Sequence, residues 1–316
     1  MKEIKIDFNN DGQRLDRFLR NLFPNAPLSF LYKSLRTGFI KVNDKKVKPN
    51  YRLNSNDILT LRLKDEVYSD ITKRDAIPRI KKSFSVLYED EDLMVVDKPP
   101  MLASQPGTGV ENNNLVNQVK AYCNSSKTAL ANRLDRGTSG IVVVGKNRKA
   151  LLAMFSLFKE HKLEKYYYAL VTGKLAKKKD TMISYLQRIK EKFQHKMLVF
   201  DKQREDTILA ESSYEVVISN NDYSLVLVKI KTGKMHQIRA QFAHIGHPIL
   251  GDSLYGDDSP LLKRQFLHAF RISFDHPFTK KKIDVSAPLA EDLVKVLNQL
   301  FDEKDLNKIK SLETFK

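Results

Sequence analysis

Asp135 is the carboxylate of this sequence whose neighbours most clearly suggest chemistry. It lies within residues 132–140 (NRLDRGTSG), and the apolar run IVVV follows at residues 141–144, so this order predicts a turn that leads into a buried strand. The arginines on either side would favour an ionised carboxylate, which can act as a nucleophile or accept a proton. Asp, Gly, Thr and Ser are also ordinary turn residues, so a carboxylate that only caps its own backbone explains the local sequence at least as well.

A second polar segment contains three histidines. Residues 233–239 (GKMHQIR) and 243–252 (AHIGHPILGD) predict a helix over residues 236–245 that ends at Gly246. Histidine is a common zinc ligand, but His236 and His244 are eight residues apart, no Glu or Cys partners them, and the HExxH pattern is absent. We therefore expect no metal site.

The chain is strongly basic. Its 316 residues include 55 Lys and Arg against 38 Asp and Glu, a formal net charge of +17. Such an excess favours a polyanionic partner, most commonly nucleic acid, although a general abundance of lysine would raise the charge without any function. Hydrophobic residues make up 41% of the chain, which is enough for a substantial core.

Cysteine usage and hydropathy indicate the compartment. Cys123 is the one cysteine and can form neither an intramolecular disulfide nor a thiolate cluster, which fits a reducing cytosol. The N-terminal residues lack the apolar core of a signal peptide, and no stretch approaches the roughly 18 apolar residues of a membrane span. We expect a cytoplasmic protein that makes no membrane contact.

Basic residues concentrate near the N-terminus. Between residues 14 and 49, nine basic residues stand against two acidic ones. Apolar spacing predicts a helix near residues 15–22 and a second one that begins at Ser29 and ends at Gly38, followed by a strand and turn at residues 40–45. We expect a compact unit with its positive charge on one face. The candidate RNA contacts in it are Arg14, Arg17, Lys33, Arg36, Lys45 and Lys46.

The rest of the chain combines strands and helices. Polar residues 66–83 predict a linker, and charged residues 301–316 predict a frayed tail or loose helix. Amphipathic spacing predicts helices at residues 151–158 and 289–300. Apolar runs predict strands at residues 93–96, 141–144, 166–171, 223–230 and 267–274. The expected fold class is α+β, a small N-terminal α/β module followed by a larger, strand-rich body.

Several segments, taken in order, resemble the RluA-type pseudouridine synthase family. Residues 132–140 are similar to its H-R-L-D-x-x-T-S-G signature, and residues 165–173 (KYYYALVTG) to its K-x-Y-x-A-x-V-x-G stretch. The lysine-proline segment, the C-terminal motif and the final strand are matched by residues 97–100, 236–256 and 267–277. The resemblance covers about residues 87–300, and residues 14–63 resemble the alpha-L RNA-binding module that precedes many of these catalytic domains.

The resemblance implies a division of the chain and an activity. It implies an alpha-L module at residues 1–65, a linker at 66–83, a mainly antiparallel catalytic domain at 84–300 and a charged tail at 301–316. The activity would be the isomerisation of a flipped-out uridine to pseudouridine in structured RNA, without cofactor or metal.

The resemblance also assigns roles to four residues. Asp135 would attack the sugar or the uracil ring, or abstract a proton, and Arg239 would pair with it. Tyr167 would stack on the uracil and help remove the C5 proton, although plain core packing also explains a tyrosine there. Ile238 would form a hydrophobic wall of the pocket.

Some positions depart from the family pattern. Asn132 replaces the usual His, Gln241 stands where His is common, and Lys234 and Met235 replace Arg and Thr. The segments around Met101 and Gln105 also differ. We expect these changes to affect substrate contacts more than the reaction.

The favoured substrate is large-subunit ribosomal RNA, bound by a monomer. Transfer RNA is an alternative, because both RNAs offer uridines in loops. A non-catalytic RNA-binding or ribosome-assembly factor on the same fold is a second alternative, but a pure binder would not need Asp135, Tyr167 and Arg239 together.

Overall fold

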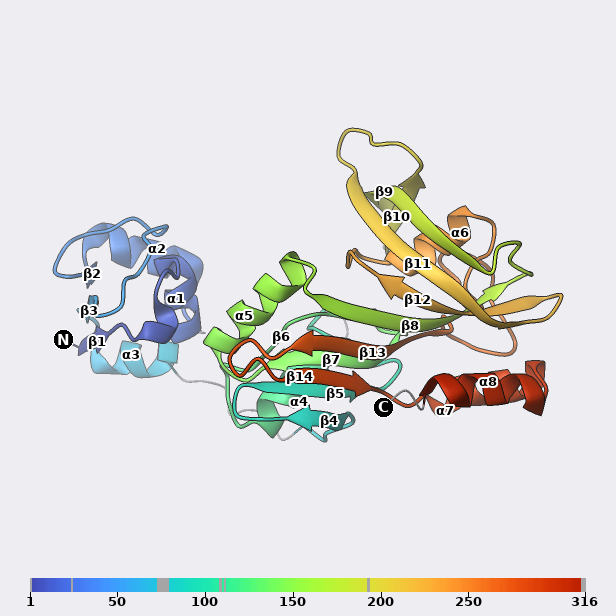
Figure 1. Ribbon diagram of the computed structural model, residues 1–316. Helices are drawn as coiled ribbons and strands as arrows, with labels where there is room; N and C mark the ends of the chain where they lie inside the picture. The colour runs from blue at the N-terminus through green and yellow to red at the C-terminus, as the bar shows by residue number, and fades with distance from the viewer. Residues whose placement is uncertain are drawn as a thin grey trace. The chain divides into compact units, whose positions relative to one another are not determined.

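The chain forms two compact units, Met1–Arg79 and Ile80–Lys316 (Figure 1). The computed structural model describes residues 2–23, 25–72, 80–107, 110, 112–191 and 194–313. The expected linker at 66–83 is only partly right. Helix α3 (Asp65–Thr72) belongs to the first unit because its apolar side packs into that core, with Ile71 buried. Residues 73–79 of the expected linker lie outside the described residues.

The described part of the small unit has a three-stranded sheet and, besides α3, two further α-helices. Its strands β1 (Lys2–Lys5), β3 (Ile58–Leu61) and β2 (Ile40–Val42) lie side by side in that order. A short 3-10 helix, η1 (Phe8–Asn10), precedes α1 (Leu15–Leu22) and α2 (Leu28–Thr37), so both expected helices are confirmed.

The second helix of the small unit begins differently from the expectation. Pro27, not Ser29, precedes the first helical residue of α2, so Ser29 lies inside the helix. Gly38 ends the helix as expected, with a left-handed φ of 83° that favours glycine.

The larger unit is built on a mainly antiparallel sheet. Its described strands pair in the order β10-β9-β11-β12-β8-β13-β7-β5-β4, with β14 beside β13 and β6 beside β7. The pair β13–β7 is parallel, and the other pairs are antiparallel. The strand bounds are β4 Ser85–Glu89, β5 Leu93–Lys98, β6 Ala129–Leu130, β7 Ser139–Gly145, β8 Leu163–Thr172, β9 Lys179–Glu191, β10 Gln194–Phe200, β11 Ile208–Ser219, β12 Tyr223–Ile230, β13 Leu267–Asp275 and β14 Lys282–Ser286.

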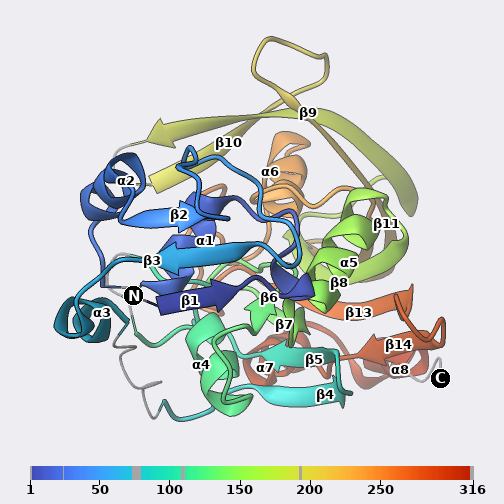
Figure 2. The same cartoon turned by 90° about the vertical axis from the view of Figure 1, so that its left-hand side faces the viewer.

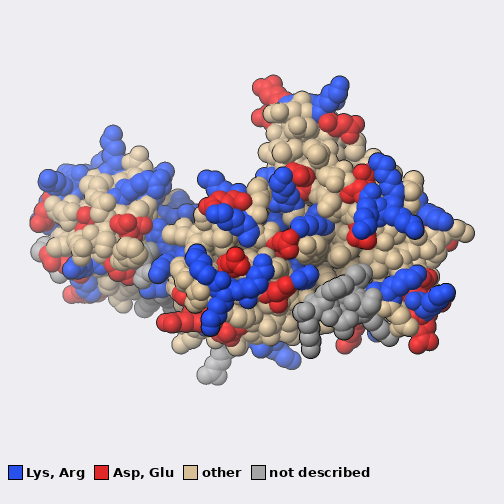
Figure 3. All heavy atoms as spheres, viewed as in Figure 1, with Lys and Arg blue, Asp and Glu red and all other residues tan. Residues whose placement is uncertain are grey.

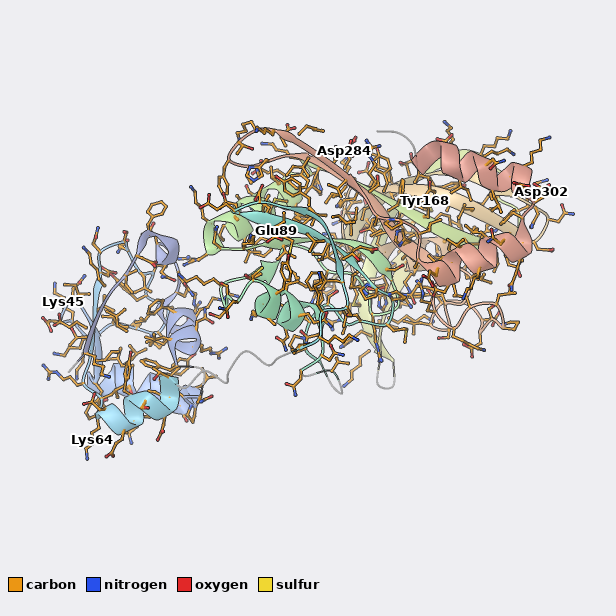
Figure 4. All side chains as sticks on the ribbon, turned by 90° about the horizontal axis from the view of Figure 1, so that it is seen from below. Lys45, Lys64, Glu89, Tyr168, Asp284 and Asp302 are labelled. Carbon is orange, nitrogen blue, oxygen red and sulfur yellow. The ribbon has the colours of Figure 1, made fainter. Side chains whose placement is uncertain are left out.

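Helices cover parts of this sheet (Figure 2). They are α4 (Leu115–Tyr122), α5 (Arg148–Lys159), α6 (Gln237–His244) and α7 (Glu291–Leu300). In Figure 1 the long strands β9 and β10 rise away from the rest of the sheet, and α6 contacts both of them. Apolar runs such as residues 141–144 form the buried centre of the sheet, and Tyr168 lies within the larger unit in Figure 4.

The C-terminal residues form a helix, so of the two expectations the frayed tail is wrong and the helix is confirmed, but this helix is packed and not loose. Helix α8 (Glu303–Glu313) places Ile309 in the core with 4% of its surface exposed, because its apolar residues recur on one side. Residues 314–316 of the expected tail lie outside the described residues. Among the described helices, none is long and apolar enough to cross a membrane.

Candidate active site

Asp135 lies in the loop between β6 and β7, and the loop is held firmly on its N-terminal side. The Ser104 hydroxyl donates to the carbonyl of Leu134 at 2.6 Å and accepts from the Leu134 N–H at 3.1 Å. The side-chain oxygen of Asn132 accepts from the Val143 N–H at 2.8 Å. These bonds fix the backbone on which the carboxylate is carried.

The C-terminal side of the loop is held by the segment before β13. The buried guanidinium of Arg264 donates to the Gly137 carbonyl at 2.8 Å and forms two bonds with Asp292, at 2.7 and 2.8 Å. The Gln265 amide donates to the Thr138 hydroxyl at 3.0 Å. The turn expected from the local sequence is therefore present, and it is anchored by residues more than 100 positions away.

Arg239 supplies the positive charge next to Asp135. Its Nη1 donates to Oδ2 of Asp135 at 2.9 Å. Its Nε and Nη2 bond to the two carboxylate oxygens of Asp252 at 2.7 and 2.8 Å, and Asp252 is only 1% exposed. Burial opposes the charge of Arg239, but its bonds and ion pairs with Asp252 and then Asp135 outweigh burial and raise its pKa. The guanidinium is thus fixed and permanently charged.

The arginines that flank Asp135 in sequence bond elsewhere. Arg133 donates to the Gln105 side chain at 3.0 Å, and Arg136 donates to the Met101 carbonyl at 3.3 Å. Among the described residues, the hydrogen bonds and ion pairs of the Asp135 carboxylate all reach Oδ2. Within the described part of the chain, Oδ1 receives none of these bonds, and the side chain is 27% exposed.

His236 and Tyr255 complete the surroundings of the carboxylate. His236 precedes α6 with a left-handed φ of 52°, and its Nε2 lies 3.7 Å from Oδ2 of Asp135. The Tyr255 hydroxyl accepts from the Met197 N–H at 2.7 Å, so its own proton can point to Nδ1 of His236 at 3.2 Å. A phenol that donates in this way leaves the imidazole proton on Nε2, toward Asp135, whereas the other tautomer donates from Nδ1 to the phenol oxygen. Burial lowers the pKa of His236, which favours the neutral ring.

Tyr167 and Ile238 lie in the same part of the larger unit as Asp135. Tyr167 is on β8 with 8% of its surface exposed, and Ile238 in α6 is also buried. Burial, and then the charge of Asp135, raise the pKa of Tyr167, so its phenol stays protonated. Tyr166 and Tyr168 flank it in sequence and therefore point to the other face of the strand.

Lys98 is a buried lysine that ties the end of β5 to the Asp135 loop. Its ammonium donates to the carbonyls of Leu102, Pro99 and Arg136 at 2.8, 2.9 and 3.3 Å. Burial, and then the charge of Arg264, lower its pKa to about 7, against the opposite effects of Asp135 and Asp97.

Two of the departures from the family pattern have roles inside the protein. Asn132 accepts from the backbone of β7, as described above. Gln241 is buried, accepts from the Ser212 hydroxyl at 2.6 Å and donates to the Ser184 hydroxyl at 2.9 Å. These bonds join α6 to β9 and β11. The expected effect of these departures on substrate contacts stays a prediction, and for Asn132 and Gln241 the structure adds these bonds inside the protein.

The six candidate RNA contacts of the small unit are all exposed. Arg14 bonds to Asp16 at 2.7 Å, so its charge is partly compensated. A Cβ atom on Gly38 would lie 2.8 Å from Cε of Lys46 and 3.6 Å from Cε of Lys41, which brings two lysines to the end of α2. Figure 3 shows Lys and Arg on the surfaces of both units, and Figure 4 labels Lys45 and Lys64 in the small one.

Sequence reasoning assigned no role to Asp252, Tyr255 or Lys98. All three belong to segments that resemble the family motifs, and this resemblance is the sequence feature that could have identified them as site residues. The pairing of Asp135 with Arg239 was expected from the resemblance alone, because the two residues are 104 positions apart and their local sequences do not show it. Within the described residues, no cluster of three or more His, Cys, Asp or Glu is arranged to hold a metal ion.

Comparisons with known proteins agree with this fold and show the family. Residues 92–244 match the family model of RNA pseudouridylate synthase, and residues 13–59 match the S4 domain. The chain is 33% identical to ribosomal large subunit pseudouridine synthase C of Vibrio vulnificus, over 94% of this chain and 96% of that protein. It is 31% identical to the Escherichia coli protein of the same name, over 95% of this chain and 97% of that one.

Solved structures show the same fold. Human RNA pseudouridylate synthase domain containing 1 matches with a TM-score of 0.56 and 24% identity, over 75% of this chain and 97% of that chain. Human RNA pseudouridylate synthase domain containing 4 also matches with a TM-score of 0.56. It is 21% identical, over 68% of this chain and 92% of that chain. The chain therefore belongs to the RluA-type family of RNA pseudouridine synthases, which are isomerases, and it carries an S4 module at its N-terminus.

Proposed function

We propose that this protein isomerises uridine to pseudouridine in large-subunit ribosomal RNA, with Asp135 as the reacting carboxylate. The names of its full-length relatives support this substrate. The observation that carries the role of Asp135 is its bond to Arg239, a guanidinium that Asp252 fixes from behind. We place the enzyme in the cytoplasm and expect it to act as a monomer.

The Oδ1 atom of Asp135 suits each of the three roles considered for this carboxylate: attack on the sugar, attack on the uracil ring, or removal of a proton. Arg239 binds Oδ2 and places a permanent positive charge beside the carboxylate, while Oδ1 can approach the sugar, the uracil ring or a proton. The reaction breaks the bond between N1 and the sugar and forms one between C5 and the sugar. The C5 proton leaves and N1 takes up a proton, so no redox cofactor is needed for the balance.

Tyr167 supports the uracil ring in this proposal. Its buried ring offers a stacking surface beside the carboxylate, which is a sequence-tolerant way to hold a base. Because its pKa is raised, the hydroxyl is a donor in the free site. Removal of the C5 proton by this hydroxyl therefore requires it to give up its own proton first, and Asp135 is the neighbouring acceptor.

Release of tritium from C5-labelled uridine in RNA tests the activity and the residue together. We expect the wild-type protein to release tritium and Asp135→Asn to show none above background. Asp180→Asn is the control, because Asp180 is an exposed carboxylate whose partner is Lys177. Absence of release by the wild-type protein on any RNA would refute the enzymatic function, and equal release by Asp135→Asn would refute the role of Asp135.

The substrate requires a separate experiment. Chemical mapping of pseudouridine in ribosomal and transfer RNA from a strain without the gene should show lost sites in large-subunit ribosomal RNA. Return of those sites with the wild-type gene, and not with Asp135→Asn, assigns them to this enzyme. Loss confined to transfer RNA would favour the alternative substrate.

A further inference from the structure

Lys165 is a buried lysine on the same face of β8 as Tyr167. The two residues are separated by one position, so their side chains point the same way about 6.6 Å apart along the strand. Lys165 is 7% exposed, and Ile272 on β13 lies directly opposite it. The aliphatic part of Lys165 is therefore packed in an apolar setting.

The ammonium of Lys165 has no acidic partner. Its Nζ lies 5.7 Å from the centre of the Phe158 ring, and a Cβ atom on Gly233 would come within 3.8 Å of it. No hydrogen bond or ion pair of Lys165 occurs within the part of the chain that the structure describes. The charged side chain that acts on it is that of Lys234, which is exposed and of the same sign.

Acidic residues in the neighbouring elements are occupied elsewhere. Glu164 follows the opposite face of β8 and pairs with Lys229. Glu211 on β11 pairs with Lys231 at 2.9 Å. Burial, and then the charge of Lys234, lower the pKa of Lys165 to about 8. A buried, unpaired ammonium is costly, and an anion placed between the two lysines would compensate both charges.

We propose that Lys165 and Lys234 form a subsite for a backbone phosphate of the RNA, next to the nucleotide held at Tyr167 and Asp135. Gly233 has no side chain that would cover the Lys165 ammonium. Two ammonium groups repel metal cations and suit a phosphate. The subsite rests on the proposed function, because the phosphate belongs to the same RNA whose uridine reacts.

The salt dependence of RNA binding tests this subsite. Binding is measured with full-length Asp135→Asn protein, so that no turnover occurs, and Lys165→Met is added to it. Met retains the packed aliphatic stem and removes the charge. We expect the slope of log K against log salt to become shallower by about 0.7–0.9, the value of one phosphate contact. Lys165→Arg should restore the slope.

Two further variants complete the design. Lys229→Met on the opposite face of the sheet, where Lys229 pairs with Glu164, should leave the slope unchanged. Lys234→Met repeats the measurement at an exposed position, where no packing is lost. A shallower slope in Lys165→Met or Lys234→Met, with Lys229→Met unchanged, supports the subsite. Unchanged slopes in both, or an equal change in Lys229→Met, overturn it.

The result is separable from the proposed function. A shallower slope together with no tritium release by the wild-type protein would retain the phosphate site and reject the isomerase activity. Tritium release with unchanged slopes would retain the isomerase activity and reject the phosphate site. In the active protein, Lys165→Met should raise KM several-fold while kcat changes less, because a phosphate contact stabilises bound substrate and transition state alike.

Discussion

Asp252 does not reach the reacting carboxylate, yet it determines where Arg239 lies. We predict that Asp252→Asn lowers kcat by about 100-fold, because a small displacement of the guanidinium misplaces Asp135. It should also lower the free energy of unfolding by about 3 kcal/mol, since a buried arginine loses its charged partner. Tritium release and urea unfolding measure the two effects.

The matched control is Asp284→Asn. Asp284 also binds an arginine, Arg271, but that pair is partly exposed, so its loss should cost less than about 1 kcal/mol and leave kcat unchanged. Equal effects of the two substitutions would show that the position of Asp252 has no special importance.

The site residues were predictable to different degrees. Asp135, Tyr167 and Arg239 were named from segments that resemble the family motifs, and the structure brings Arg239 onto Asp135. Asp252 lies in a segment that resembles a family motif, but no role was assigned to it. Nothing in the local sequence shows which arginine a buried aspartate will contact.

At the scale of elements, the parallel pair β7–β13 is joined by a buried histidine. The Ser139 hydroxyl lies 3.0 Å from Nδ1 of His268, and Nε2 lies 3.3 Å from the Ala287 carbonyl. The carbonyl can only accept, so the proton is on Nε2 and Ser139 donates to Nδ1. Burial lowers the pKa of His268 to about 4, so the ring is neutral in the folded protein.

We predict that His268 makes the protein less stable in acid. The unfolded chain binds a proton at this histidine below about pH 6.5, whereas the folded protein resists it down to about pH 4. Stability is therefore complete above pH 6.5 and falls as the pH drops to 4, by about 3 kcal/mol. Urea unfolding at several pH values should show a weaker acid dependence for His268→Gln.

His244→Gln provides the comparison for this pH dependence. His244 is a partly exposed histidine that pairs with Asp201, so His244→Gln controls for the loss of a histidine outside the core. An unchanged acid dependence in His268→Gln would contradict the prediction.

Gly140 allows β7 and β13 to approach each other closely. A Cβ atom there would lie 2.3 Å from the Ala269 carbonyl oxygen, and the residue has a φ of 103°. We predict that Gly140→Ala lowers the free energy of unfolding by at least about 3 kcal/mol. Gly246→Ala is the control, because its φ is also positive, at 82°, but no atom lies within 4 Å. Gly246→Ala should lower the free energy of unfolding by about 1 kcal/mol. Similar losses for the two substitutions would refute the role of close packing at Gly140.

Sequence patterns identified the buried elements better than the exposed ones. The strand expected at residues 223–230 matches β12, because its apolar run is buried in the centre of the sheet. Strands β9, β10 and β11 were not predicted. They carry many polar residues, since part of their surface is exposed, and their pairing depends on tertiary contacts with α6.

At the scale of the whole molecule, the S4 module should provide much of the RNA affinity. We predict that replacing Lys33, Arg36, Lys45 and Lys46 together by Gln in the full chain weakens RNA binding at least tenfold at low salt, because exposed phosphate contacts are lost. Filter binding at two salt concentrations measures the effect, which should shrink as salt rises. Arg14→Gln should change less, because Asp16 already compensates Arg14. A loss independent of salt would contradict phosphate docking.

The place of β13 in the sheet has a consequence for biosynthesis. It lies between β8 and β7, and the segment just before it supplies Arg264 and Gln265, which hold the Asp135 loop. A ribosome makes these residues after every other strand of the larger sheet except β14. Until they emerge, β7 and β8 lack the strand that joins them, and the loop lacks its second anchor. A nascent chain thus carries Asp135 long before both anchors of its loop exist, so the enzyme becomes competent only after β13 has been made.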